Sequence, residues 1–271
     1  MPEPVDAMPP EPPRLKSEPI GVRILGEVDP ATLTKEAFDA SPNLLYHGSA
    51  KQFTYKQAFD YGDEEYIADN DGSQTLGAGF YTTDLLSAAE NYSKERQGRN
   101  IDAYPFVTRV LPYEARVLDL RASKDIGHNA SLPSEIFNKW FDHYRDYYHK
   151  PGRENLPWYI SEVENEYMEI LNKAKALIDT GELLDLRNIL GTGSSAKLRT
   201  RNWSSPCYMK LFADFMMQQG FDGLVYIEGG EGPKREIHPS FVFYNLAKVG
   251  TFETWQEHAR QAIESPAGSA V

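Results

Sequence analysis

The hydrophobic pattern of the sequence changes twice, and this change limits the folds that the chain can adopt. Before residue 121 the apolar residues come in short segments bounded by glycine, proline or acidic residues, which is typical of strands. Between residues 131 and 219 large apolar side chains recur at helical spacing, and strand-like segments return after Gly220. Strands on both sides of a helical block predict an α+β fold with an inserted helical subdomain.

The expected strands are short and rich in β-branched and aromatic residues, which favour extended backbone. They are Gly21–Leu25, Leu44–Gly48, Phe80–Thr83, Phe106–Leu111, Ala115–Leu120, Phe221–Ile227 and Ser240–Tyr244.

Helices are expected where a capping residue precedes an apolar pattern of helical period. Asp29 and Asp84 are such residues, because an aspartate side chain accepts hydrogen bonds from the first free N–H groups of a helix. The helix after Asp84 should end near Glu95. Another should run from Met209 to Gln219 and stop at Gly220, a residue that readily adopts the left-handed conformation of a helix end.

The chain of 271 residues is long enough for one large domain that contains a substantial insertion. Residues 1–19 are rich in proline and glutamate, so they are expected to form an extended, poorly ordered tail. The domain itself is expected to span residues 20–263, with the helical insertion at 131–219. Residues 264–271 should be frayed.

Charge and cysteine content exclude several classes of protein. The net charge of -12 opposes broad binding to phosphate backbones or anionic lipid surfaces. Cys207 is the only cysteine, so the chain has no intrachain disulfide, and no metal site is expected. The sequence contains neither an apolar run of about 18 residues nor a Sec-type signal. We therefore expect no membrane insertion, and a cytoplasmic location or export by a route that reads no Sec signal.

Two segments that combine a strand with glycine carry the candidate site residues. The first runs from Leu44 through His47-Gly48-Ser49. The second is Gly77-Ala78-Gly79-Phe80-Tyr81, followed by a helical pattern that contains Tyr92. A histidine after a strand is by itself more often a structural hydrogen-bond partner than a catalytic group, so the interpretation depends on reading both segments together.

Together these segments resemble the ADP-ribosyltransferase superfamily. The branch that they resemble contains diphtheria toxin and the poly-ADP-ribose polymerases and is named for a His-Tyr-Glu triad. The chain looks closest to its bacterial and phage-type members, which share a strand like Gly220–Tyr226. The likeness covers most expected strands but neither the helical block nor the proline-rich tail. It implies a split antiparallel β-sheet core and NAD as co-substrate.

The resemblance also implies a role for each matching residue. His47 would hydrogen-bond a ribose hydroxyl of NAD, and the Gly48 backbone would bind the nicotinamide carboxamide. Tyr81 and Tyr92 would stack on the two faces of the nicotinamide ring. The remaining members of the expected NAD-binding set are Tyr46, Ser49, Gly79 and Phe80.

The catalytic glutamate of the family does not stand at its usual place. It normally begins the strand that here contains Phe241, and Ser240 occupies that position. Glu228, Glu231 and Glu236 precede it, and each is able to bring a carboxylate to the site. We favour Glu231, because its position resembles that of a glutamate in phage-type relatives, and we rank Glu236 second. The expected catalytic set is therefore His47, Tyr81, Glu231 and Glu236.

The resulting hypothesis is a mono-ADP-ribosyltransferase that releases nicotinamide and transfers ADP-ribose to a macromolecular acceptor. The acidic chain favours a protein acceptor over nucleic acid. Use as an effector or toxin is typical of the relatives that the chain resembles. Two alternatives stay open at this point: a catalytically impaired module that binds NAD or ADP-ribose, suggested by Ser240, and a helical interaction scaffold whose working surface is residues 131–219.

Overall fold

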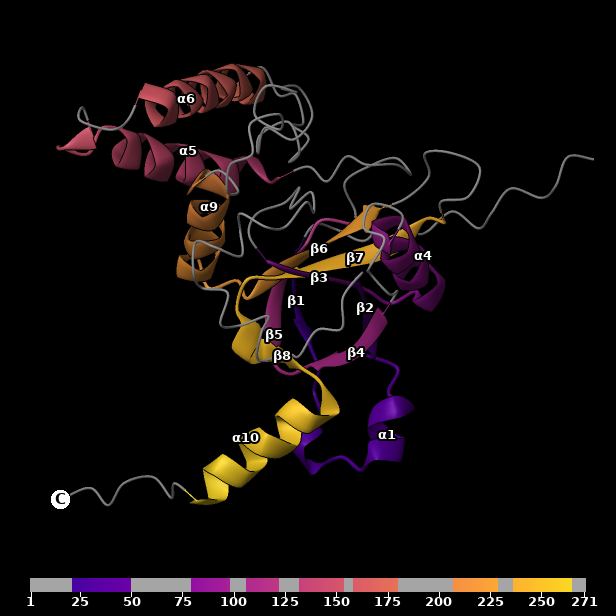
Figure 1. Cartoon of the computed structure of the whole chain (residues 1–271). Coiled ribbons are helices and arrows are strands. Elements are labelled where there is room, and N and C mark those ends of the chain that lie inside the picture. The colour runs from indigo at the N-terminus through magenta and orange to yellow at the C-terminus, as the bar shows by residue number, and fades with distance from the viewer. Residues whose placement is uncertain are drawn as a thin grey trace, which may run out of the picture.

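The computed structural model describes residues 21–49, 79–97, 106–121, 132–153, 158–179, 207–228 and 236–264. These ranges contain eight strands and six α-helices, which form a mixed α+β structure around one curled sheet (Figure 1). The α+β class predicted from the order of strand and helix patterns is confirmed. No helix in the described ranges is both long and apolar enough to cross a membrane.

The eight strands form a single hydrogen-bonded series in the order β1-β5-β6-β7-β3-β2-β4-β8. Their bounds are β1 Gly21–Leu25, β2 Leu45–Ser49, β3 Phe80–Thr83, β4 Phe106–Pro112, β5 Ala115–Asp119, β6 Gly223–Glu228, β7 His238–Phe243 and β8 Val249–Gly250.

Pairing in the sheet is antiparallel except between β5 and β6, which run parallel. A parallel pair needs a long crossover that returns the chain to the same end of the sheet. The helical insertion supplies that crossover, because α5 (Ser134–Tyr148), α6 (Trp158–Asp179) and α9 (Cys207–Gln218) all lie between these two strands in sequence. This parallel pair departs from the antiparallel pairing that the resemblance implies for the core.

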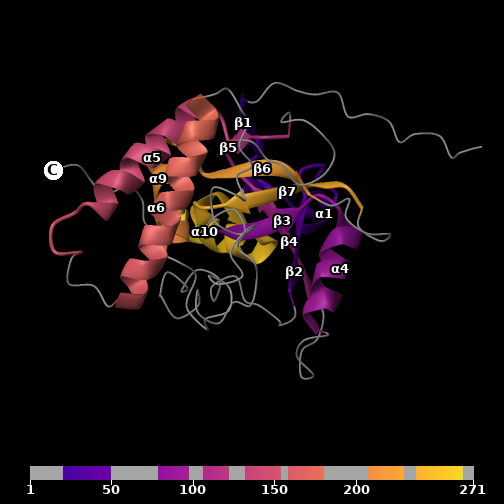
Figure 2. The ribbon, with the colours of Figure 1, turned by 90° about the horizontal axis from the view of Figure 1, so that it is seen from above.

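The three described helices of the insertion gather at one side of the sheet in both views (Figures 1 and 2). Alternate residues of β5, β6 and β7 face them, and the two layers enclose one cluster of buried side chains. Trp140 lies at its centre, fully buried, with Phe212 edge-on at 5.2 Å and its indole N–H donating to the Tyr167 hydroxyl at 3.1 Å. The insertion thus shares its core with the sheet.

In β5, β6 and β7, the residues that alternate with those facing the helices point to the opposite face of the sheet. They fill the interior of the curled sheet. Val117, Val225, Phe241 and Phe243 are buried there with Phe80. A third cluster joins the sheet to two further helices, α1 (Lys35–Asp39) and α10 (Phe252–Glu264), and contains Phe38, Leu44, Leu111 and Trp255.

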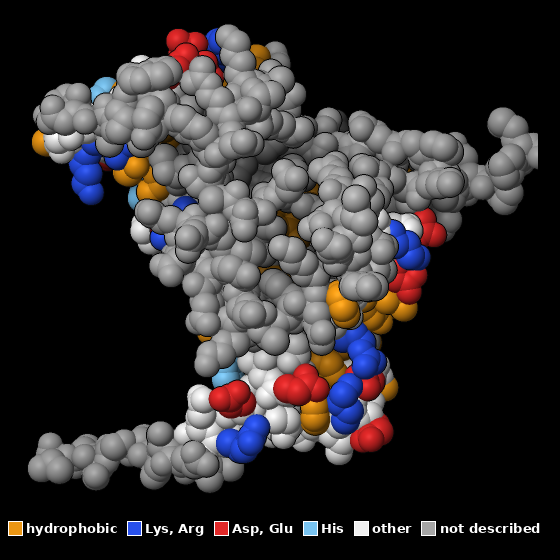
Figure 3. All heavy atoms as spheres, viewed as in Figure 1, with side chains coloured by type: hydrophobic (Ala, Val, Ile, Leu, Met, Phe, Trp, Pro, Cys, Tyr) orange, Lys and Arg blue, Asp and Glu red, His pale blue; other side chains and the backbone are white. Residues whose placement is uncertain are grey.

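Ion pairs lie on the surface above this third cluster. Asp39 accepts from both Lys35 and Arg109. Figure 3 shows acidic and basic side chains mixed on the lower part of the molecule, over α1 and α10. Such mixed charges at an exposed surface contribute little net stability.

Two helix ends test the capping predictions. Gly220 has a φ of 79°, and its N–H donates to the Met217 carbonyl, so the predicted stop after α9 is confirmed. The helix after β3, α4 (Leu86–Gln97), begins one residue later than predicted. There the Thr83 hydroxyl, rather than the Asp84 carboxylate, accepts from the Leu85 N–H at 3.1 Å. The prediction that Asp84 caps this helix is therefore wrong, because a start at Leu86 makes Leu85 the residue that precedes the first turn.

Candidate functional site

The structure brings His47 and Tyr81 together at the junction of β2 and β3. The Nδ1 atom of His47 lies 2.7 Å from the backbone carbonyl oxygen of Tyr81. Because a carbonyl only accepts, Nδ1 carries the hydrogen, which fixes the tautomer of the neutral ring. The imidazole also stacks on Phe80, with 4.6 Å between ring centroids. The histidine that the sequence singles out is thus held in one orientation by the motif that lies 34 residues away in sequence.

Glycine at position 48 is required by the close packing of β2 against α4. A Cβ atom at Gly48 would lie 2.0 Å from the carbonyl oxygen of Ala89, a backbone atom that cannot move aside alone. Gly79 is similarly enclosed, since its Cβ would meet a Val242 methyl group at 2.6 Å. Both expected glycines therefore serve close approaches between elements of this fold.

The other members of the expected NAD-binding set occupy different environments. Tyr46 is half-buried and packs against the third core cluster, beneath α1 and α10. Ser49 ends β2 opposite Phe106 of β4. Phe80 is buried in the interior of the curled sheet as well as stacked on His47. These positions support the strand that carries His47.

A half-buried carboxylate, that of Glu228, lies beside Ser240 at the end of β6. The register pairs Tyr226 with Ser240 and Glu228 with His238, so these four side chains share one face of the sheet. The hydroxyl groups of Tyr226 and Ser240 both donate to Oε2 of Glu228, at 2.8 and 2.9 Å. The Tyr92 hydroxyl of α4 is a third hydrogen-bond partner of this carboxylate.

Opposing effects act on the pKa of Glu228. Desolvation, the largest of them, raises the pKa, whereas hydrogen bonds from Tyr92, Tyr226 and Ser240 and the nearby His238 lower it. The net result is a pKa below the ordinary value of a glutamate, so the carboxylate is ionised at neutral pH. Burial and the charge of Glu228 raise the pKa of Tyr226 well above its ordinary value, which keeps that phenol protonated as a donor.

The two tyrosines expected to hold nicotinamide approach this cluster from different elements. Tyr81 lies on β3 opposite Val242, and Tyr92 lies on α4. Tyr81 packs against the buried cluster that contains Tyr226, and the Tyr92 hydroxyl hydrogen-bonds to Glu228. The tyrosine motif and the Glu228 carboxylate therefore belong to one site.

The glutamates favoured from the sequence are arranged differently. Glu236 is exposed, and its carboxylate accepts from the Ser87 hydroxyl in the first turn of α4. Glu231 lies outside the described residues. Glu228 is the glutamate that the described structure brings to Ser240. The strand pattern contains the signal for this arrangement, because Tyr226 and Glu228 are two residues apart and must point to the same face.

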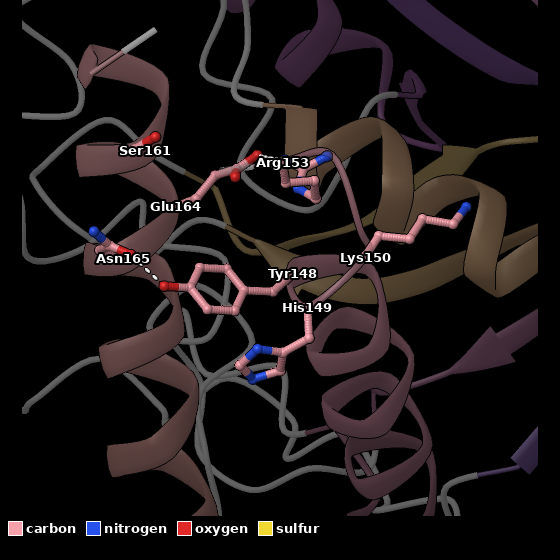
Figure 4. A pocket seen from close by; sticks show the side chains of 7 residues that line it. All are labelled: Tyr148, His149, Lys150, Arg153, Ser161, Glu164 and Asn165. Carbon is pink, nitrogen blue, oxygen red and sulfur yellow. Dashed lines mark hydrogen bonds and ion pairs between the residues drawn. The ribbon is translucent and has the colours of Figure 1, made fainter. Parts of the chain in front are cut away.

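A separate pocket lies within the helical insertion, between the end of α5 and α6 (Figure 4). Its volume is about 310 Å³, and it contains an Arg153–Glu164 ion pair and a Tyr148–Asn165 hydrogen bond. None of the residues predicted to bind NAD lines this pocket. Arg153 and Glu164 already pair with each other in this pocket, and the candidate site that we consider further is the group around Glu228.

The described residues include no group of three or more histidine, cysteine, aspartate or glutamate side chains arranged to hold a metal ion. Comparisons of the chain with family models, with curated proteins and with solved structures found no match.

Proposed function

We propose that this chain is an NAD-dependent mono-ADP-ribosyltransferase. It releases nicotinamide and transfers ADP-ribose to a macromolecular acceptor, for which a protein is favoured. The observation that carries the proposal is the Glu228 carboxylate, which hydrogen-bonds to Tyr92, Tyr226 and Ser240, the residue that stands where the resembled family carries its glutamate.

The proposed reaction begins with cleavage of the bond between nicotinamide and its ribose. Positive charge develops on the ribose as this bond breaks, and a fixed carboxylate in a partly desolvated site stabilises that charge. Glu228 is suited to this role because its hydroxyl partners fix its position before substrate arrives. The aromatic groups of Tyr81 and Tyr92 hold the nicotinamide ring, and His47 holds the ribose through a hydroxyl.

The arrangement of Glu228 also weighs on the two alternatives. The impaired binding module was suggested by Ser240 in place of a glutamate, and a carboxylate from the adjacent strand now lies within hydrogen-bonding distance of that serine. The scaffold hypothesis needs an exposed helical surface, whereas the apolar faces of α5, α6 and α9 pack into a core shared with the sheet. Both observations favour the enzyme.

The test is to incubate the purified chain with NAD labelled in its nicotinamide and to measure label release. Glu228→Gln keeps the size of the side chain but removes its charge, so we expect turnover to fall by about 10²–10³-fold while NAD binding by calorimetry is largely retained. Glu231→Gln and Glu236→Gln test the two glutamates favoured from the sequence. Glu257→Gln is the matched control, because Glu257 is an exposed residue of α10.

Two results would contradict the proposal at different levels. If the wild-type chain binds NAD without releasing nicotinamide, the chain is a binding module. If it releases nicotinamide but Glu228→Gln is as active as Glu257→Gln, the carboxylate has been assigned to the wrong residue.

A further inference from the structure

His238 is a buried imidazole whose two nitrogen atoms are in different situations. The residue begins β7 and is only 5% exposed. Its Nδ1 lies 2.9 Å from the backbone carbonyl oxygen of Glu236, which only accepts, so Nδ1 carries the hydrogen of the neutral ring. Nε2 is therefore left with a lone pair. This atom is buried, and nothing in the described part of the chain hydrogen-bonds to it.

Burying a hydrogen-bonding atom without a partner costs free energy, so an unpartnered nitrogen of this kind calls for an explanation. A ligand that brings a donor group would provide one. The position of the ring supports this explanation, because His238 is the cross-strand neighbour of Glu228. The ring of Tyr92 meets it edge-on, with 6.3 Å between centroids.

The charged and titratable groups around His238 come from three other elements. Glu228 faces it from β6, Tyr92 from α4, and Asp84, which follows β3, interacts with it electrostatically. Glu228 itself is a poor proton acceptor, because three hydroxyl groups already donate to it and its pKa is lowered.

We propose that Nε2 of His238 accepts the proton of the incoming nucleophile during transfer, and that this nucleophile is a hydroxyl group of a protein side chain. This inference rests on the proposed function. A base is useful only to a nucleophile that has a proton to lose, which favours a hydroxyl over a carboxylate as acceptor. The acidic net charge of the chain favours a protein over a nucleic acid as the molecule that carries this hydroxyl group.

The step balances without any further reactant. The bond between C1′ of the ribose and the pyridinium nitrogen breaks, and its electron pair leaves with neutral nicotinamide. The oxygen of the hydroxyl forms the new bond to C1′ while its proton passes to Nε2. The imidazolium then returns that proton to solvent. Glu228 stabilises the charge on the ribose, and His238 handles the proton.

The experiment compares nucleophiles that do and do not carry a proton. Nicotinamide release is measured for the wild-type chain and His238→Gln with water, with methanol and with azide, an anion that has no proton to lose. We expect His238→Gln to be about 10²-fold slower with water and methanol, and azide to restore most of the rate. His258→Gln is the control, since His258 is an exposed histidine of α10.

Each outcome supports or overturns the inference. If the wild-type chain is active and His238→Gln is equally active with water, His238 is not the base, although the proposed function stands. If His238→Gln is slowed equally with all three nucleophiles, the histidine only positions the site, and the inference is wrong. If the wild-type chain releases no nicotinamide, the proposed function and this inference fall together.

Two further measurements do not depend on the folding of a variant. Imidazole ¹⁵N spectra of the wild-type chain should show His238 with a protonated Nδ1 and a bare Nε2; the opposite tautomer would overturn the inference. Protein labelled with ADP-ribose should carry a linkage that resists hydroxylamine. A hydroxylamine-sensitive linkage would identify a carboxylate acceptor, and label transferred to RNA or DNA would identify nucleic acid. Either result would overturn the acceptor class.

Discussion

The substitution Gly48→Ala tests how strictly the site depends on the approach of β2 to α4. The added Cβ would lie 2.0 Å from the Ala89 carbonyl oxygen and 2.9 Å from its carbon, whereas ordinary van der Waals contact begins at 3.4 Å. The helix must therefore retreat by about 1.4 Å, and overpacking of this kind costs about 1–3 kcal/mol. We expect the free energy of unfolding in urea to fall by that amount.

The same retreat should affect the chemistry, because α4 carries Tyr92, whose hydroxyl reaches Glu228. A displacement of about 1 Å at a catalytic group typically lowers turnover by about 10²-fold. The assay is nicotinamide release at a temperature where urea titration shows the variant to be fully folded.

Gly152→Ala provides the contrast. Gly152 has a φ of 92°, so alanine there is strained, but nothing lies within 4 Å of the added Cβ. We expect a loss of roughly 1–2 kcal/mol in stability with unchanged turnover. The reasoning is refuted if Gly48→Ala unfolds like the wild-type chain, or if the two variants lose activity to the same degree.

Two other predictions concern the core and the carboxylate. Trp140→Ala should lower the free energy of unfolding by about 3–5 kcal/mol, because it removes a fully buried indole and the hydrogen-bond donor to Tyr167. Denaturant titration measures this loss. A smaller loss than that of Tyr148→Ala would contradict the packing described. The pKa of Glu228 is lower in the folded chain than its ordinary value, so its stabilising contribution is complete above about pH 4.3 and is lost as the pH falls through the folded pKa. Ser240→Ala removes one hydrogen-bond donor to this carboxylate and should raise the pKa of Glu228. In the pH profile of nicotinamide release, the loss of activity on the acid side should then move to higher pH. If the acid side of the profile does not move, Glu228 does not control it.

Local features of the fold were predictable from the sequence because their causes are local. Gly220 ends α9 as expected, since a glycine after an apolar helical pattern readily adopts a positive φ. The strand from Phe80 to Thr83 has the predicted bounds, because its β-rich residues lie between a glycine and a helix. Asp84 failed as a cap because the helix begins at Leu86, one residue later than an Asp84 cap requires, and residue type alone does not fix where the first turn begins.

The strand order and the partner of Ser240 depend on contacts between distant residues. Nothing near Glu228 in sequence indicates that β6 pairs with β7 in a register that brings this side chain to Ser240. The parallel pairing of β5 with β6 likewise depends on where the helical crossover returns the chain. Alternation along β6 does place Tyr226 and Glu228 on one face. This pattern favours Glu228 as the carboxylate of the site, whereas the resemblance to phage-type proteins favours Glu231.

Strand β7 is the link between two parts of the sheet, and it follows all the other described strands except β8 in sequence. Without it, β1, β5 and β6 form one set of paired strands, and β3, β2, β4 and β8 form another. During translation, the edges of β6 and β3 have no partner until residues 238–243 have left the ribosome. Exposed strand edges promote aggregation, so a nascent chain that stalls before His238 should need chaperone protection that a chain containing β7 does not.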